Sequence, residues 1–234
     1  MNNKERGRLY GIGVGPGDPE LITVKALKRI RQTEVIALPG TSARETTAYK
    51  IAVQICPELA GKTLLPLDFP MTKDRVKLRK AHEEAARLVL SHLDEGRDVA
   101  FLTLGDPTVY STYLYLHRLI LESGREAEII SGVPSFCAAA ATLGCSLAER
   151  DEMIHILPGE ADGKLLNSLV GTRVLMKAGR KMADVLDNLS EKDEVSIVEN
   201  CGFPDQRIYR EGRETDATTG YFTLAIIKRK EETP

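Results

Sequence analysis

The sequence predicts an α/β protein of two domains, and three observations support this prediction. Candidate strands and helices alternate from residue 9 to residue 143, which is typical of a parallel sheet with helices on both faces. Residues 99–104 form a continuous apolar run, the pattern of a strand buried on both faces. After about residue 148 the character changes, and three late strands with short polar connections favour a mixed sheet with antiparallel edges. We therefore expect an N-terminal domain over residues 1–148 and a C-terminal domain over residues 149–234.

In the N-terminal half, the spacing of apolar residues switches repeatedly between the strand and the helix period. Pro39 and Gly40 stop the second strand, and Gly96 is well placed to end a long helix rich in Ala, Leu, Lys, Arg and Glu. The expected strands cover residues 9–14, 35–38, 63–67, 99–104 and 128–130, and the expected helices cover residues 24–30, 46–56, 74–95, 111–122 and 134–143.

The C-terminal half carries fewer helices. Two of them are expected, over residues 165–170 and 182–189. The expected strands cover residues 153–157, 173–177, 195–198, 206–210 and 222–227.

Charge and hydrophobicity argue against two classes of partner. With 32 Lys and Arg against 34 Asp and Glu, the formal net charge is -2, so the molecule has no global field that would gather nucleic acid. Apolar runs such as residues 138–141 and 224–227 are far shorter than the ~20 residues that a membrane-spanning helix needs. Residues 1–8 are polar and lack the apolar stretch of a secretion signal, which favours the cytoplasm.

The cysteines and histidines do not follow the spacing of a metal site. No Cys-x-x-Cys pair occurs, so we expect neither a zinc cage nor a disulfide framework, and most cysteines are expected to be buried. The histidines are scattered along the chain, so we expect no protein-bound metal. The residues concerned are Cys56, Cys137, Cys145, Cys201, His82, His92, His117 and His155.

A glycine-rich turn follows the first expected strand, in the run from Gly11 to Asp18. The dinucleotide fingerprint fails in each register, because Pro16, Asp18 or Glu20 stands where the third glycine is needed. A phosphate loop fails as well, since no Gly-Lys-Ser/Thr follows. What remains is a turn poor in side chains, against which a large ligand could lie, or a structural turn without a ligand.

Two further turns follow strands of the same expected sheet, over residues 104–112 and 131–136. Ligands of open α/β sheets bind outside the carboxyl ends of the strands, which places Asp106 at the crevice. Its carboxylate could bind a ribose hydroxyl or act as a base, whereas Ser111 and Thr112 could equally cap a helix. Three such turns at one sheet edge predict a ligand site there.

In this order, the segments 13–23, 105–112 and 132–135 resemble the tetrapyrrole methylases, and the resemblance continues through residues 174–177 and 198–200. Within that family, residues 67–74 and the Tyr-Ser-Thr run 110–112 are most similar to enzymes that methylate carbon 20 of precorrin-2, or of its cobalt form, in cobalamin biosynthesis. The chain departs from the wider family at Ser131, where Pro is common, and at Cys201, where Gly often follows Glu-Asn.

The resemblance implies a homodimer of two α/β domains, with S-adenosyl-L-methionine in the cleft between them and S-adenosyl-L-homocysteine as product. Leu104, Gly105, Asp106 and Val109 would contact the amino-acid and ribose portions of the donor. The full set of implied donor-binding residues is Pro16, Leu104, Gly105, Asp106, Val109, Ser111, Thr112, Pro134, Ser135, Met176, Lys177 and Cys201.

The implied chemistry needs few catalytic groups, because the methyl group of a sulfonium is already activated and mainly has to be aligned. Asp106 is the candidate base, with donor binding alone as its alternative role. The tetrapyrrole carries many carboxylates, which favours a cleft lined by Arg and Lys, and any cobalt would arrive with it. Candidate substrate contacts are Gly15, Gly17, Asp18, Arg44, Lys73 and Tyr110, and further basic candidates are Arg75, Lys177 and Arg180.

Alternatives remain within and outside the family. The acceptor could be another ring carbon, a ribosomal RNA ribose, or a modified histidine of a translation factor as in diphthine synthase. RNA is disfavoured by the net charge and by the absence of a basic tail. Outside enzymes, the chain could be a donor-binding module without an acceptor site.

Overall fold

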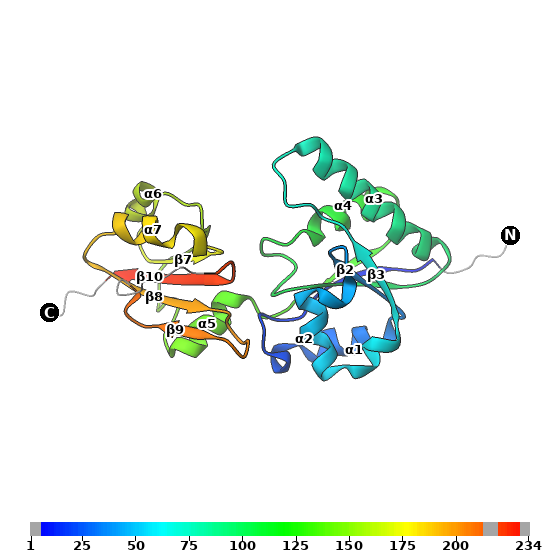
Figure 1. The fold of residues 1–234 in the computed structure, drawn as a ribbon, viewed down its shortest axis with the longest axis horizontal. Coiled ribbons are helices and arrows are strands. Elements are labelled where there is room, and N and C mark those ends of the chain that lie inside the picture. The colour runs from blue at the N-terminus through cyan, green and yellow to red at the C-terminus, as the bar shows by residue number, and fades with distance from the viewer. Residues whose placement is uncertain (1–5, 213–219, 230–234) are drawn as a thin grey trace. The chain divides into compact units, whose positions relative to one another are not determined.

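The structure is a computed structural model that describes residues 6–212 and 220–229. The chain divides into two compact units, Met1–Pro134 and Ser135–Pro234. This division differs from the expected boundary near residue 148, because helix α5 (Ser135–Leu143) packs on a strand of the second unit. Figure 1 labels the elements of both units.

The first unit is built on a parallel sheet of order β3-β2-β4-β1-β5. The strands are β1 (Leu9–Gly13), β2 (Val35–Pro39), β3 (Thr63–Leu67), β4 (Val99–Thr103) and β5 (Ala127–Ile130). Its helices are α1 (Val24–Gln32), α2 (Thr47–Ile55), α3 (Arg75–Asp94) and α4 (Tyr113–Glu122). The elements follow the sequence-based expectations closely, and the short 3-10 helices η1 (Pro19–Leu21), η2 (Ala43–Glu45) and η3 (Pro57–Gly61) come in addition.

Helices cover both faces of this sheet, as Figure 1 shows, with α3 and α4 on one face and α1 and α2 on the other. Phe101 and Leu9 of the central strands pack with Val89 and Leu116 on the first face. Because side chains alternate along a strand, fully buried neighbours such as Ile12 point to the opposite face. Burial on both sides explains why strand 99–103 is apolar apart from Thr103.

The second unit has a mixed sheet of order β6-β7-β10-β8-β9. Strands β6 and β7 are parallel, whereas β10 runs antiparallel to both β7 and β8. The strands are β6 (Ile154–Pro158), β7 (Thr172–Met176), β8 (Asp193–Glu199), β9 (Arg207–Tyr209) and β10 (Thr223–Arg229), and the other helices are α6 (Gly163–Ser168), η4 (Gly179–Lys181) and α7 (Met182–Asn188). The expected α/β class, with a parallel and then a mixed sheet, is confirmed.

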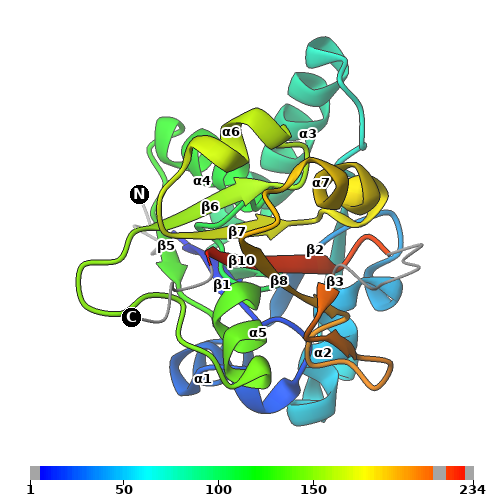
Figure 2. The same cartoon turned by 90° about the vertical axis from the view of Figure 1, so that its left-hand side faces the viewer.

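The core of the second unit combines an apolar layer with one buried ion pair. Figure 2 shows α6 and α7 on one side of the sheet and α5 on the other. Leu175 and Ile197 pack against Met182 on the α6 and α7 side. On the same side, the Arg173 guanidinium bonds both carboxylate oxygens of Asp193, at 2.7 and 3.2 Å, with side-chain exposures of 1% and 0%.

Two kinds of feature are absent from residues 6–212 and 220–229. No helix in these ranges is long and apolar enough to cross a membrane. The same residues contain no group of three or more His, Cys, Asp and Glu side chains that could hold a metal ion. Cys56 and Cys201 are buried as expected, but Cys137 and Cys145 are exposed, which corrects the expectation that most cysteines are buried.

Candidate functional site

The five loops that carry most of the expected site residues lie at one edge of the first sheet. All five strands are parallel, so the loops that follow them share the carboxyl edge. After β1 the chain crosses β4 to reach β2, and after β4 it crosses β1 to reach β5. The chain therefore turns in opposite directions from the adjacent strands β1 and β4, which is the position where open α/β sheets bind ligands.

The loops after β1 and β4 are joined main chain to main chain. The N–H of Gly105 donates to the carbonyl of Gly15 at 2.7 Å, and the N–H of Gly15 donates back at 3.3 Å. Both glycines have positive φ, 77° for Gly15 and 69° for Gly105. A side chain in that conformation is strained, so this paired turn favours glycine at both positions.

Close contacts between main-chain atoms explain why two more positions are glycine. A Cβ on Gly13 would lie 2.4 Å from the carbonyl oxygen of Gly105, and one on Gly132 would lie 2.2 Å from the same atom. Three loops therefore meet at Gly105, and its own Cβ position faces open space with nothing within 4 Å. The packing accounts for Gly13 and Gly132 without a ligand, whereas at Gly105 the positive φ alone favours glycine, because a Cβ there would meet nothing within 4 Å.

Asp106 joins the second loop to the third. Its Oδ1 accepts hydrogen bonds from the N–H and hydroxyl of Thr108, at 2.7 and 2.5 Å, and its Oδ2 accepts from the N–H of Gly132 at 3.0 Å. The side chain is buried. Three hydrogen bonds hold this carboxylate in one orientation and join its loop to Gly132, so the geometry favours a positioning role over that of a base.

The turn between Asp106 and α4 has an unusual backbone. Tyr110 has a φ of 47°, in the left-handed region that non-glycine residues rarely adopt, and it is exposed. The Ser111 hydroxyl lies 3.0 Å from that of Thr103 and accepts the N–H of Tyr113 at 3.2 Å. Ser111 thus serves the start of α4, whereas Thr112 makes no side-chain capping bond.

The expected substrate contacts at this edge differ in their availability. Arg44 donates to the hydroxyl of Tyr49 at 2.8 Å and to the carbonyl of Ala60 at 2.9 Å, so much of its guanidinium stabilises α2 and η3. Asp18 caps η1 by accepting the N–H of Glu20, beside the buried residues Pro16 and Gly17. Lys73 is exposed in the loop that leads to α3.

In the second unit, β6, β7 and β8 are parallel and also share a carboxyl edge. Lys177 directly follows β7 with a φ of 61°, and Asn200 follows β8 with a φ of 48°. The carbonyl of Met176 accepts the N–H of Gly159 at 2.7 Å. Two non-glycine residues with positive φ at one edge are a signal of function that the sequence does not carry.

Cys201 turns its side chain into the second unit. The thiol is buried and hydrogen-bonded to Thr142 of α5, and its burial raises its pKa above the usual range. Contact with a ligand would therefore use the main chain of Cys201, and a role as a nucleophile is disfavoured.

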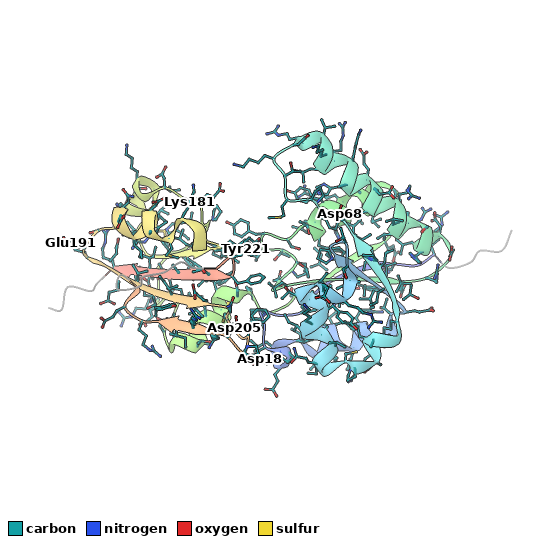
Figure 3. The ribbon with its side chains drawn as sticks, in the orientation of Figure 1. Asp18, Asp68, Lys181, Glu191, Asp205 and Tyr221 are labelled. Carbon is teal, nitrogen blue, oxygen red and sulfur yellow. The ribbon has the colours of Figure 1, made fainter. Side chains whose placement is uncertain are left out.

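An aromatic group at this second edge was missed by sequence reasoning. The rings of Phe203 and Phe222 are stacked at 6.0 Å, and Lys177 Nζ lies 5.5 Å from the centre of the Tyr221 ring. Figure 3 labels Tyr221, which lies just before the start of β10. Aromatic residues close together in sequence beside a loop would be a usable signal of such a group. Here Phe203 and Tyr221 lie 18 residues apart in sequence, so no local pattern reveals it.

The remaining expected residues divide between the units. Pro134 closes the first unit and Ser135 begins α5 in the second. Leu104 and Val109 are half-buried in the loop after β4. Arg75 is exposed at the start of α3, and the side chain of Arg180 lies outside the described part of the chain.

Comparison with known proteins identifies relatives of the whole chain. The family model of the Tetrapyrrole (Corrin/Porphyrin) Methylases matches residues 8–216. A protein of Methanocaldococcus jannaschii named "Probable cobalt-precorrin-2 C(20)-methyltransferase" is 35% identical over 97% of this chain and 98% of its own length. A precorrin-2 C(20)-methyltransferase of Sinorhizobium sp is 30% identical over 97% of this chain and 98% of its own length.

The fold has solved counterparts. The uroporphyrin-III C-methyl transferase of Thermus thermophilus, in complex with S-adenyl homocysteine, superposes with a TM-score of 0.70. The match covers 95% of this chain and 97% of the other, at 22% sequence identity, and therefore concerns the fold.

Proposed function

Because the chain belongs to the tetrapyrrole (corrin/porphyrin) methylase family, we propose that it transfers the methyl group of S-adenosyl-L-methionine to carbon 20 of precorrin-2 or of cobalt-precorrin-2, in cobalamin biosynthesis. The names of the Methanocaldococcus and Sinorhizobium relatives, each matched over nearly its full length, support this ring position. One of them is named for cobalt-precorrin-2 and the other for precorrin-2, so both macrocycles are candidate substrates.

The observation that carries the proposal is the junction of three loops at the carboxyl edge of the first sheet. The motif glycines hold these loops together, and nothing lies within 4 Å of the Cβ position of Gly105. A ligand can lie against such a turn, which carries few side chains. We propose that Pro16, Leu104, Gly105 and Val109 contribute to donor binding from this unit, and that Ser135, Met176, Lys177 and the main chain of Cys201 contribute from the other.

When bound, the donor supplies an activated methyl group, and the protein has to align acceptor carbon, methyl carbon and sulfur. We propose that Asp106 contributes to this alignment by positioning a loop. Its three hydrogen bonds fix the loop after β4 against the N–H of Gly132, and so fix the main chain beside Gly105. The acceptor carbon ends the reaction with one proton fewer, and in this assignment Asp106 does not take that proton.

The proposal extends to assembly and location. Exposed apolar side chains surround the edge strand β6, with Met153 55% and Val170 67% exposed and Ile154 on the strand itself. Such a patch on an edge strand supports a homodimer, for which light scattering after gel filtration is the test. We further propose that the enzyme acts in the cytoplasm.

The function is tested by anaerobic incubation with 13C-methyl-labelled donor and each macrocycle, followed by NMR of the product. The expected result is one labelled methyl group at carbon 20 and one equivalent of S-adenosyl-L-homocysteine. A label at another ring carbon would show that the enzyme has another activity of the family. Donor binding in calorimetry without methylation of either macrocycle would contradict the proposal, and activity on a translation factor would then favour the protein-modifying alternative.

A further inference from the structure

The segment between β3 and the second turn of α3 carries a concentrated positive charge. Residues 71–80, named here the basic arm, contain five basic side chains and one acid, so their formal net charge is 5 - 1 = +4. The whole chain has a net charge of -2, so the rest carries -2 - 4 = -6. The basic residues are Lys73, Arg75, Lys77, Arg79 and Lys80.

The charge is not neutralised locally. Asp74, the only acid of the basic arm, turns its Oδ1 to the N–H groups of Val76 and Lys77, at 2.9 and 3.1 Å, and so caps α3. Within residues 6–212 and 220–229, Arg79 is the one basic residue of the arm with an ion-pair partner, Glu83 at 3.7 Å. The other four basic side chains are exposed to solvent.

Apolar side chains stand exposed among these charges. Met71 is 88% exposed and Val76 is 54% exposed. These two side chains offer an apolar contact surface beside the cations. The combination fits a ligand that has an apolar face and an anionic rim.

The basic arm begins at the ligand edge of the first sheet. It follows the carboxyl end of β3, where the carbonyl of Leu67 accepts the N–H of Gly40 at 2.7 Å from the loop after β2. Figure 3 labels Asp68 at this point, and Figure 1 shows the chain continuing from the tip of β3 to the start of α3. The arm therefore borders the same edge as the loops assigned to the donor.

We propose that the basic arm captures the tetrapyrrole substrate, with its cations on the peripheral carboxylates and Met71 against the ring. This inference rests on the proposed function, since it names the part of the chain that selects its substrate. A polycarboxylate macrocycle fits better than an acidic protein, because ten residues offer far less than the roughly 800 Å² per partner of a specific protein interface. Charge at the edge of a cleft acts mainly on association.

The test compares two triple variants with equal loss of charge. The first is Lys73→Gln, Arg75→Gln and Lys77→Gln, and the control is Lys28→Gln, Lys164→Gln and Arg207→Gln, three exposed basic residues elsewhere. At about 10 mM ionic strength we expect the first variant to lose about tenfold in kcat/KM, through KM, with kcat and donor affinity within about twofold of wild type. The control is expected to stay within about twofold, and at about 1 M salt all three proteins should converge.

A binding measurement separates this inference from the proposed function. Fluorescence titration uses uroporphyrin, an octacarboxylate, and coproporphyrin, a tetracarboxylate on the same ring. Wild type is expected to bind uroporphyrin more tightly than coproporphyrin, and the triple arm variant is expected to lose that preference. Met71→Ser is expected to weaken the binding of both porphyrins to the same extent.

An arm variant with wild-type kcat/KM, salt dependence and porphyrin preference would overturn the inference while leaving the proposed function intact. Absence of turnover in wild type, with the porphyrin preference still lost in the arm variant, would instead overturn only the choice of acceptor.

Discussion

The two sheet edges assigned to the ligand are built in different ways. At the edge of the first sheet, glycines let three loops touch main chain to main chain, and one buried carboxylate ties two of them. At the edge of the second sheet, Lys177 and Asn200 adopt positive φ without being glycine, and aromatic rings stand beside them. Contacts between main-chain groups dominate the first edge, whereas side chains dominate the second.

This difference decides what the sequence could predict. Glycines required by contact are visible as a motif, and so the loops after β1, β4 and β5 could be identified from residues alone. The strained residues of the second edge look like any lysine or asparagine, because the surrounding fold imposes their conformation. There the expectation at Met176, Lys177 and Cys201 rested on resemblance.

The largest expected effect concerns the core that supports the second edge. Asp193→Ala leaves the guanidinium of Arg173 buried and without its ion-pair partner, which costs about 3–5 kcal/mol of stability. Urea unfolding followed by far-UV circular dichroism measures this loss. Asp187→Ala, on the exposed face of α7, is the matched control and should change stability by no more than about 0.5 kcal/mol. If the two variants are equally stable, the ion pair between Arg173 and Asp193 does not stabilise the fold as we expect.

Next in size is the contact that defines the first edge. Gly132→Ala places a Cβ 2.2 Å from the carbonyl of Gly105, so the loops must separate, and methyl transfer should fall by about 100-fold. Steady-state kcat/KM measures the effect. Gly61→Ala is the control, because nothing lies within 4 Å of its Cβ position. Wild-type kinetics of Gly132→Ala would show that loop contact is not required.

Asp106→Asn is expected to reduce kcat/KM by about tenfold, since one of its oxygens becomes a donor that faces a donor. The shape of the pH–rate profile should stay unchanged, because a positioning residue does not exchange the reacting proton. Asp68→Asn, an exposed carboxylate at the same edge, should have no effect. Disappearance of the acid limb of the profile in Asp106→Asn would restore the role of base that the sequence suggested.

The smallest effect tests the strain at the second edge. Lys177→Val introduces a β-branched side chain at a φ of 61° and should lower stability by about 1–2 kcal/mol. Lys177→Gly should remain within about 0.5 kcal/mol of wild type, because relief of strain and loss of chain entropy oppose each other. Both are read from urea unfolding midpoints. If valine is tolerated as well as glycine, the backbone there is not strained.

The limits of sequence-based prediction have physical causes. The described α-helices and strands were expected with small shifts at their ends, because most follow an apolar period, whereas the short 3-10 helices η1 to η4 were not expected. The role of Arg44 was not accessible, since its bonds to Tyr49 and Ala60 depend on how α2 and η3 pack. The placement of α5 in the second unit likewise depends on its packing against β10, which no local pattern encodes.

The claim that the three joined loops form the donor site is tested most directly by a crystal structure of the complex with S-adenosyl-L-homocysteine. The account predicts that the product of the donor lies against the main chain at Gly105, with Asp106 still bonded to the N–H of Gly132. Density for the ligand away from the loops after β1, β4 and β5, or a rotated Asp106 that contacts the ligand with both oxygens, would contradict it.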